Sequence, residues 1–293
     1  MAVCFVVFNP AQTKRILMNY LYTKNHLDIQ GIPNFTLELV YEGRQPEIHN
    51  AFHVSSNSFM FHKENLYKVM EPKIPCKYKK LAFLDCDVLF PDTEWYFKVS
   101  KLLDTHDVVQ PFEDAVWMDL TYTKKMLRRK SVLFLQTPLW DFQYHPGFAW
   151  CMRRDWFKKV GFFEYAVSGS GDTLSVSAWM NKTFPRNFQS LPKALVSEYM
   201  RYRKLPVPRI AYLDGVVIYH LYHGARANRK YAERHKMLEV PEDITRLVKK
   251  NKQGVFEWNN PDRWNPLFLD YFVSRNDDDL SEEPVKTDSH RRS

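Results

Sequence analysis

The chain has 293 residues, of which 45% are hydrophobic and 26% are charged, and its formal net charge is +8. These fractions are typical of a globular protein and exclude a mostly disordered chain, a collagen-like fibre and a polytopic membrane protein. The aromatic content of 15% is high. The sequence pI of about 9.1 favours an anionic partner, which composition leaves open among a nucleic acid, a membrane surface and a diphosphate-bearing small molecule.

Cysteine usage and the N-terminal segment predict a soluble, cytoplasmic protein. Four cysteines in a chain of this length make no disulfide framework, and none of their spacings is that of a metal site. The apolar stretch 3–8 ends at Asn9-Pro10, which is too short for the core of a signal peptide and for a membrane span. No other window reaches the roughly 18 apolar residues that a spanning helix needs.

Strands and helices alternate over the first part of the chain. Apolar runs predict strands over 3–8, 36–41, 80–90 and 107–110. Apolar residues at helical spacing predict helices over 12–24, 63–70 and 93–103. This alternation predicts an α/β fold with a central, mostly parallel sheet flanked by helices.

The second half is less regular and ends in a polar tail. We expect strands over 147–153 and 216–220, and a short helix that Asp155 caps. Further helices are expected over 173–180 and, strongly basic, over 226–238. From Asn276 onward the apolar residues are lost, so we expect one domain over 1–275 and a disordered tail over 276–293. The tail holds six acids and three bases, so the domain itself carries +11.

Two aspartates, Asp85 and Asp87, stand in the predicted strand 80–90 where its apolar run is interrupted. In open α/β sheets, ligands bind beyond the carboxyl ends of strands, and alternation along a strand sends both side chains the same way. Two such carboxylates are costly to hold together unless a cation neutralises them, and a hard divalent cation would also bind diphosphate oxygens. The alternative is a strand end whose acids cap the next loop or pair with Lys79 and Lys80.

A second cluster combines two histidines, a glycine and a run of cations. His220 and His223 follow the predicted strand 216–220. An imidazole can complete a metal sphere that carboxylates begin, while a glycine amide and arginines can hold phosphate oxygens. Taken one at a time, each histidine could be a satisfied core or surface residue and the cations a solvated helix face. Together with the aspartates they predict a diphosphate site, whose further members are Gly224, Arg226, Arg229, Lys230 and Arg234.

A third cluster is a carboxylate presented by a glycine-containing loop. Asp172 follows Gly169-Ser170-Gly171 directly before the predicted helix 173–180, where it could accept a hydrogen bond from a substrate hydroxyl. The alternative role is a helix N-cap. Trp150 could stack on a sugar face, and the alternative for it is a place in the core.

Taken in chain order, the motifs of this sequence resemble those of the metal-dependent glycosyltransferases of the GT-A fold, over roughly residues 1–240. The chain is particularly similar to the soluble enzymes with which large DNA viruses of algae, the chloroviruses, build capsid glycans. The segments that carry the resemblance are Phe8-Asn9-Pro10, Phe61-His62-Lys63-Glu64-Asn65-Leu66, Leu84-Asp85-Cys86-Asp87, Val109-Gln110-Pro111-Phe112, Pro146-Gly147-Phe148-Ala149-Trp150, Gly169-Ser170-Gly171-Asp172 and His220-Leu221-Tyr222-His223-Gly224.

The resemblance implies a nucleoside-diphosphate-sugar donor, a glycan acceptor and a Mn²⁺ or Mg²⁺ ion. It makes Asp87 a direct metal ligand, with Asp85 touching ribose or a metal-bound water and His220 or His223 as the distal ligand. It implies a donor-binding half over 1–112 and an acceptor half over 113–275. The donor site would comprise Phe8, Asn9, Glu42, Lys63, Asn65, Asp85, Gly224, Arg226, Arg229 and Lys230.

On the acceptor side, the resemblance implies three residues that bind the acceptor: Trp150, Gly171 and Asp172. Asp172 stands where inverting members keep their catalytic base. Many of those members carry paired acids at this point, whereas this chain has Gly171-Asp172-Thr173.

The expected reaction is a single displacement at the anomeric carbon, with UDP-xylose as the donor and a fucose-containing viral capsid glycan as the acceptor, in the host cytoplasm. One alternative is a phosphatase of the haloacid-dehalogenase type with Asp85 as nucleophile, although that motif normally lies on the first strand. Another is a non-catalytic glycan- or nucleic-acid-binding protein, although the sequence holds no zinc site or RNA-binding motif. We expect no nucleic-acid partner, and the oligomeric state stays open.

Overall fold

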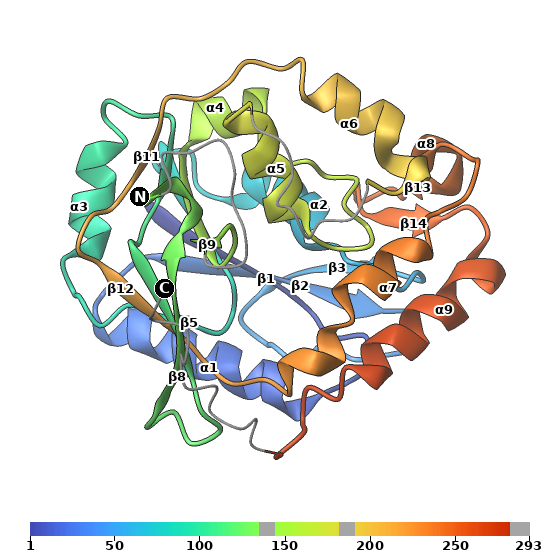
Figure 1. Cartoon of the computed structure of the whole chain (residues 1–293), viewed down its shortest axis with the longest axis horizontal. Coiled ribbons are helices and arrows are strands. Elements are labelled where there is room, and N and C mark those ends of the chain that lie inside the picture. The colour runs from blue at the N-terminus through green and yellow to red at the C-terminus, as the bar shows by residue number, and fades with distance from the viewer. Residues whose placement is uncertain (135–143, 182–190, 282–293) are drawn as a thin grey trace, which may run out of the picture.

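The computed structural model describes residues 1–134, 144–181 and 191–281 and confirms the expected α/β architecture (Figure 1). A seven-stranded sheet runs in the order β11-β6-β10-β4-β1-β2-β3. Only β10 is antiparallel to its neighbours within this sheet, so the sheet is mostly parallel, as predicted. Its strands are β1 (Ala2–Phe8), β2 (Asn34–Tyr41), β3 (Phe52–Ser56), β4 (Lys80–Leu84), β6 (Val108–Gln110), β10 (Ala149–Arg153) and β11 (Ile210–Tyr212).

Two smaller sheets flank the large one. Figure 1 shows β5, β12 and β8 on the side of α3, with β13 and β14 on the opposite side of the molecule near α9. The five-stranded sheet has the order β5-β12-β7-β8-β9, and β13 pairs with β14. The bounds are β5 (Val88–Leu89), β7 (Asp114–Met118), β8 (Lys125–Ser131), β9 (Tyr144–His145), β12 (Val217–His220), β13 (Val248–Lys250) and β14 (Phe256–Trp258).

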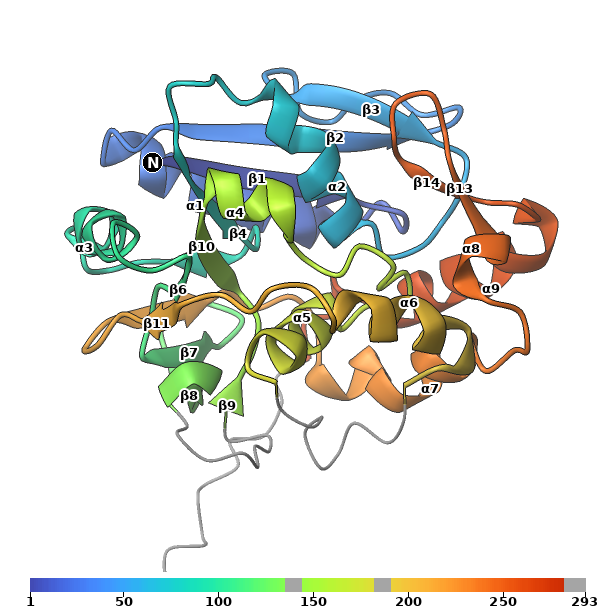
Figure 2. The ribbon, with the colours of Figure 1, turned by 90° about the horizontal axis from the view of Figure 1, so that it is seen from above.

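Helices cover both faces of the seven-stranded sheet (Figure 2). The α-helices are α1 (Lys14–Ile29), α2 (Lys63–Met70), α3 (Trp95–Leu102), α4 (Arg154–Lys159), α5 (Gly171–Trp179), α6 (Val196–Tyr202), α7 (Tyr231–Lys236), α8 (Ile244–Leu247) and α9 (Pro261–Ser274). Short 3₁₀ helices are η1 (Glu71–Lys73), η2 (Val132–Phe134), η3 (Lys193–Leu195) and η4 (Arg226–Arg229). Among the described residues no helix is both long and apolar enough to cross a membrane.

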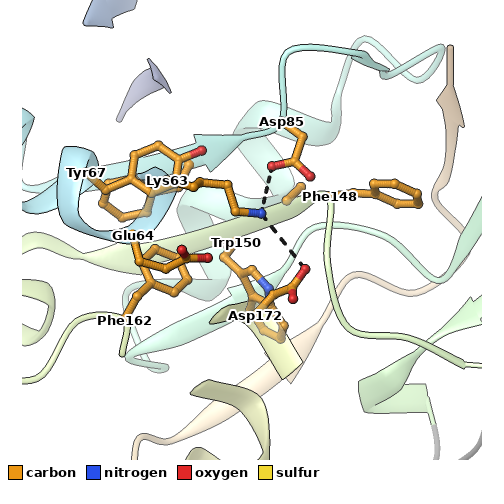
Figure 3. A pocket seen from close by; sticks show the side chains of 10 residues that line it. Lys63, Glu64, Tyr67, Asp85, Phe148, Trp150, Phe162 and Asp172 are labelled. Atoms are coloured by element: carbon orange, nitrogen blue, oxygen red, sulfur yellow. Dashed lines mark hydrogen bonds and ion pairs between the residues drawn. The ribbon is translucent and has the colours of Figure 1, made fainter. Parts of the chain in front are cut away.

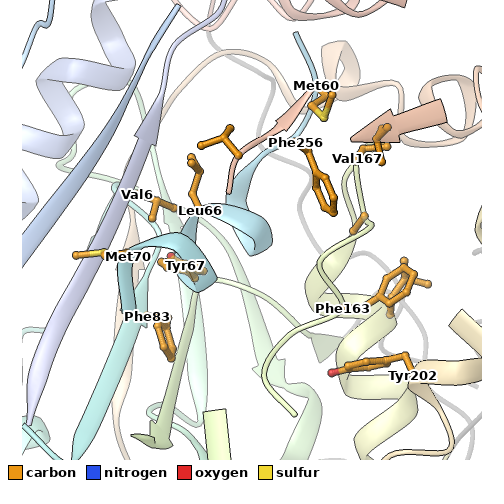
Figure 4. Packing of buried hydrophobic residues seen from close by; sticks show 14 of the residues in the cluster. Val6, Met60, Leu66, Tyr67, Met70, Phe83, Phe163, Val167, Tyr202 and Phe256 are labelled. Atoms are coloured by element: carbon orange, nitrogen blue, oxygen red, sulfur yellow. The ribbon is translucent and has the colours of Figure 1, made fainter. Parts of the chain in front are cut away.

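The alternation of side chains along β1 explains the two hydrophobic cores. Val3, Phe5 and Val7 point to the core that α1 and α3 cover, which contains Tyr20 and Trp95. Ala2, Cys4 and Val6 point to the other core, where the helices α2, α4, α5, α6, α8 and α9 supply side chains. Figure 4 shows Val6 in this core with Leu66 of α2 and Tyr202 of α6. A strand covered on both faces has to be apolar throughout, which is why its sequence is a continuous apolar run.

The predicted strand 80–90 is wrong in one respect that decides the site. It is two strands in two sheets, because β4 ends at Leu84 in the large sheet and β5 pairs with β12 in the five-stranded sheet. Asp85 and Asp87 lie in the turn between them. The rule that alternate residues face the same way therefore does not apply to these two aspartates.

Two helix predictions also need correction. The basic segment 226–238 is interrupted because Lys230 adopts a left-handed conformation, with φ at +40°, which separates η4 from α7. Asp155 is not the N-cap residue of α4, because Arg153 holds that position; its carboxylate accepts hydrogen bonds from the Arg153 guanidinium and, over 2.8 Å, from the backbone N–H of Trp156 in the first turn.

The tail begins later than predicted. Residues 275–281, called here the C-terminal strap, pack against the domain, and Asp277 is only 2% exposed. Hydrogen bonds hold the strap in place, which a hydropathy pattern does not detect. Arg275 donates to Asp277 over 3.0 Å, and Tyr222 donates to the carbonyl of Ser281 over 2.9 Å. The rest of the predicted tail, 282–293, lies outside the described residues.

The strap also supplies the cap of α1. The Asp278 carboxylate accepts hydrogen bonds from the backbone N–H groups of Lys14 (3.0 Å) and Arg15 (2.7 Å). Thr13 occupies the N-cap position but its side chain makes no capping hydrogen bond. A carboxylate at this end of a helix satisfies free N–H groups and complements the helix dipole.

We therefore expect Asp278→Ala to lower the free energy of unfolding by about 1 kcal/mol, the usual value of a capping side chain. Chemical denaturation with wild type in parallel measures this. Asp279→Ala in the same strap is the matched control, because the Asp279 side chain accepts hydrogen bonds from Ser281 within the strap itself. Equal stability of Asp278→Ala and wild type would contradict the capping role.

Candidate active site

The turn after β4 delivers its two aspartates to different clusters. The Asp85 carboxylate accepts a hydrogen bond from Lys63 Nζ over 3.1 Å. An Asp87 carboxylate oxygen lies 3.0 Å from His223 Nε2 and 3.6 Å from His220 Nε2. Because the backbone turns between them, the two residues serve two neighbouring centres rather than one.

The first centre is the Asp–His–His cluster, formed by Asp87, His220 and His223. One potential ligand atom from each lies within 4.8 Å of the others, and all three come from the turn after β4 and the end of β12. In the described part of the chain, Asp87 Oδ1 and His220 Nδ1 are buried without a hydrogen-bond partner. Buried polar atoms without a partner are costly. The cluster therefore has both the residue types of a cation site and the unpaired atoms that a bound cation would satisfy.

Electrostatics favour the ligand forms of these groups. Burial alone would raise the pKa of Asp87, but the imidazoles of His220 and His223 outweigh it and hold that pKa well below its usual range. Burial lowers the pKa of His220 to about 4, with Asp87 opposing, so its imidazole is neutral at neutral pH. One carboxylate and two imidazole rings are a ligand set for a transition-metal cation rather than for Mg²⁺, which prefers oxygen ligands.

A second layer of charge surrounds His223. Asp277 Oδ1 lies 3.5 Å from His223 Nδ1, on the side away from Asp87. A carboxylate behind a histidine is the arrangement that orients metal-ligating imidazoles. Arg229 also contacts His223, with its guanidinium 2.7 Å from the ring and 3.3 Å from the carbonyl.

Other residues predicted to bind phosphate lie in and beside η4. The Arg226 guanidinium lies over the Trp117 ring at 5.9 Å. Gly224 has a φ of +79°, and a Cβ there would overlap the carbonyl of Asn276, so glycine is needed for the strap to pass. Lys230 provides the left-handed break between η4 and α7.

The second centre is the acid pocket, which we define by Lys63, Glu64, Asp85 and Asp172 (Figure 3). Lys63 Nζ lies 3.1 Å from Asp85 and 3.9 Å from Asp172. Burial opposes the charge of Lys63, but the carboxylates of Asp85 and Asp172 outweigh it and raise the pKa of Lys63. Burial raises the pKa of Asp85 to about 6, against the effect of Lys63.

Apolar and aromatic groups line the rest of the acid pocket: Tyr67, Phe83, Phe148, Ala149, Trp150 and Phe162. Two glycines make room for the carboxylates. A Cβ on Gly147 would overlap the Asp172 carboxylate, and one on Gly171 would overlap the Glu64 carboxyl group. Trp150 is 3% exposed and donates to the carbonyl of Pro146, so most of its ring belongs to the core.

Phe148 separates the two centres. Its ring stacks on His145 at 3.8 Å between centroids and on His220 at 4.5 Å. Its φ is +76°, a strained conformation for a bulky residue that is typical of functional sites. Its carbonyl accepts a hydrogen bond from the Asp85 N–H over 2.7 Å, so the strained residue also fixes the turn that carries both aspartates.

Four residues predicted for the donor site lie in the contacts described next, and their role in donor binding stays a prediction. Asn65 accepts from Phe256 N–H and donates to the Gly254 carbonyl, which ties α2 to the segment leading into β14. The Asn9 side chain accepts from the N–H of Thr13. Phe8 packs edge-on against the rings of Phe61, His62 and Phe272, and Glu42 is exposed in the turn after β2.

Sequence reasoning missed two residues of these centres. Glu64 lines the acid pocket, and its signal was its place in the first turn of α2 beside Lys63. Asp277 backs the Asp–His–His cluster from a segment without apolar residues, and nothing in its sequence neighbourhood indicated burial.

No family model and no curated protein matches the chain. Solved structures that resemble it include a Drosophila β-1,4-galactosyltransferase 7 mutant in complex with manganese, UDP-Gal and xylobiose, at 12% identity and a TM-score of 0.43 over 91% of this chain and 98% of that one. Another is a glycosyltransferase involved in the glycosylation of the major capsid of PBCV-1, at 13% identity and a TM-score of 0.32 over 81% and 98%. A third is the galactosyltransferase LgtC with donor and acceptor sugar analogs, at 10% identity and a TM-score of 0.31 over 82% and 97%. At such low similarity, the function of this chain has to be inferred from its own residues.

Proposed function

We propose that the protein is a metal-dependent glycosyltransferase with the GT-A organisation. The observation that supports this most is the Asp–His–His cluster beside the acid pocket, both reached from the turn after β4. A cation site next to a pocket with carboxylates and aromatic walls fits the transfer of a sugar from a nucleoside diphosphate.

In this proposal Asp87, His220 and His223 hold the divalent cation, and Asp85 contacts the donor from the same turn. The cation supplies positive charge toward the leaving diphosphate when it is bound. Arg229 and Lys230 belong to the phosphate side of the site, and Lys63 neutralises the carboxylates that face the sugar.

Asp172 is the proposed base. Its carboxylate lines the acid pocket, where it can accept the proton of an acceptor hydroxyl as that oxygen attacks the anomeric carbon. Because the acceptor oxygen attacks the face of the anomeric carbon opposite the leaving diphosphate in a single displacement, the product has inverted stereochemistry. Trp150 and Gly171 shape the acceptor side of the pocket.

We further propose UDP-xylose as the donor and a fucose-containing capsid glycan as the acceptor, in the cytoplasm of a virus-infected host. The resemblance of the sequence motifs to the chlorovirus enzymes is the support for this choice. The division into a donor-binding half over 1–112 and an acceptor half over 113–275 belongs to the same proposal.

The test is a transfer assay with UDP-, GDP- and dTDP-sugars and fucosylated acceptors, with Mn²⁺ present or removed by EDTA. We expect transfer from one class of nucleotide sugar, its loss with EDTA and its return when Mn²⁺ is added back. Undiminished transfer in EDTA would contradict the metal-dependent assignment. A phosphoaspartate analogue trapped on Asp85 by fluoroberyllate, without sugar transfer, would support the phosphatase alternative instead.

A further inference from the structure

Glu64 is the carboxyl group of the acid pocket that the proposed reaction does not use. It stands in the first turn of α2, where its residue is 4% exposed, and it lines the pocket together with Lys63 and Asp172. Figure 3 shows its carboxyl group directed toward the same space as the ammonium group of Lys63. The close packing against Gly171 leaves the Glu64 carboxyl group little freedom to move toward solvent.

The charges of the pocket do not balance if all its carboxyl groups are ionised. Lys63 contributes one positive charge, and its ammonium group forms ion pairs with Asp85 and Asp172. In the described ranges of the chain, the Glu64 side chain has no ion pair and no hydrogen bond from another side chain. The backbone N–H of Glu64 itself favours the carboxylate, but a buried carboxylate without an ion pair is unfavourable, whereas the neutral acid is tolerated.

We propose that Glu64 is kept as the neutral carboxylic acid and donates a hydrogen bond to a hydroxyl of the acceptor sugar bound in the acid pocket. The sugar is the part of this inference that rests on the proposed function. The pocket would then offer three kinds of contact: an O–H donor from Glu64, an acceptor at Asp172, and apolar walls from Tyr67, Trp150 and Phe162. A sugar, with donor and acceptor hydroxyls around an apolar ring face, fits this combination.

The surroundings of Glu64 support the neutral form. Burial raises its pKa to about 7, Lys63 lowers it, and Asp172 and Asp85 raise it further. The charged and titratable groups that face it are Lys63 and Tyr67 from α2, Asp172 from α5, Asp85 from the turn after β4 and Tyr202 from α6. The acid form therefore predominates below neutral pH and is lost as the pH rises through about 7.

The protonation state can be measured without any enzymatic activity. In the intact protein with carbon-13-labelled glutamate, one side-chain carboxyl resonance should titrate near pH 7, and it should be missing in Glu64→Gln. The Asp172→Asn variant gives a second assignment, since removing that negative charge should lower the midpoint of the Glu64 resonance. The inference is overturned if every glutamate carboxyl titrates near the ordinary value of about 4.3.

The hydrogen bond to the sugar is tested by kinetics. Glu64→Ala should raise the KM for the acceptor roughly tenfold, whereas Glu64→Gln, which keeps a donor, should raise it only about threefold. Wild-type transfer should fall as the pH rises through about 7, and this decline should be absent in Glu64→Gln. Equal losses in both variants with an unaltered pH profile would overturn the role. If wild type transfers no sugar, the proposed function fails, while the carboxyl titration still decides the state of Glu64.

Discussion

Replacing Asp172 with asparagine should reduce the rate of sugar transfer by about 10²–10⁴-fold, the usual contribution of a general base. Asparagine has nearly the same shape, so the fit beside Gly147 is kept, but it loses the 3.9 Å ion pair with Lys63 and cannot take up the acceptor proton. The binding of the nucleotide sugar should change little, because the Asp–His–His cluster and its phosphate side are not altered. The measurements are kcat for transfer and donor affinity by calorimetry.

A matched control for this substitution is Asp155→Asn. Asp155 is an exposed carboxylate on α4 that pairs with Arg153, away from the pocket. It should transfer sugar at the wild-type rate. If Asp172→Asn also transferred at that rate, Asp172 would not be the base and single displacement through it would be wrong.

Replacing Asp87 with alanine should remove tight binding of Mn²⁺ and with it the transfer activity. Loss of a residue that merely supports a metal ligand typically costs 10–100-fold in affinity, so loss of the carboxylate ligand itself should cost at least about 100-fold. The substitution also leaves His220 and His223 without the carboxylate that they face. Calorimetric titration with MnCl₂ measures this effect independently of any sugar substrate.

Asp85→Asn separates the two aspartates of the motif. Asp85 pairs with Lys63 and is not part of the Asp–His–His cluster, so this variant should bind Mn²⁺ much more tightly than Asp87→Ala. Activity should still fall, because Lys63 loses its nearest negative partner in the pocket. Wild-type affinity for Mn²⁺ in Asp87→Ala would contradict the placement of the cation.

Local patterns were sufficient to predict most of the large sheet. The apolar run of β1, the helical spacing of α2 and the strand before His220 all appear in the structure close to the expected bounds. The buried faces of these strands and helices carry their apolar residues, so the hydropathy pattern of each element reflects its burial. The grouping of Asp87 with both histidines also follows from strand ends that the sequence indicated.

What the sequence could not show depends on contacts between distant residues. The apolar pattern of 80–90 continues through a change of sheet, because Val88 and Leu89 are as apolar on β5 as Leu81 and Leu84 are on β4. Asp277 is buried by polar contacts with Arg275 and His223, which a hydropathy pattern does not detect. Glu64 becomes distinctive only when Asp172, more than one hundred residues later, is placed in the same pocket.

The C-terminal strap joins two parts of the domain through neighbouring residues. Asp277 lies against His223 of the cluster, and Asp278, the next residue, holds the first N–H groups of α1, a separation of 264 residues in sequence from Lys14. A ligand that binds at His223 and a substitution at the start of α1 therefore act on the same short segment. Coupling between two sites is reciprocal, so if a ligand at His223 stabilises the first turn of α1 through the strap, then weakening that turn weakens the binding of the same ligand by the same factor.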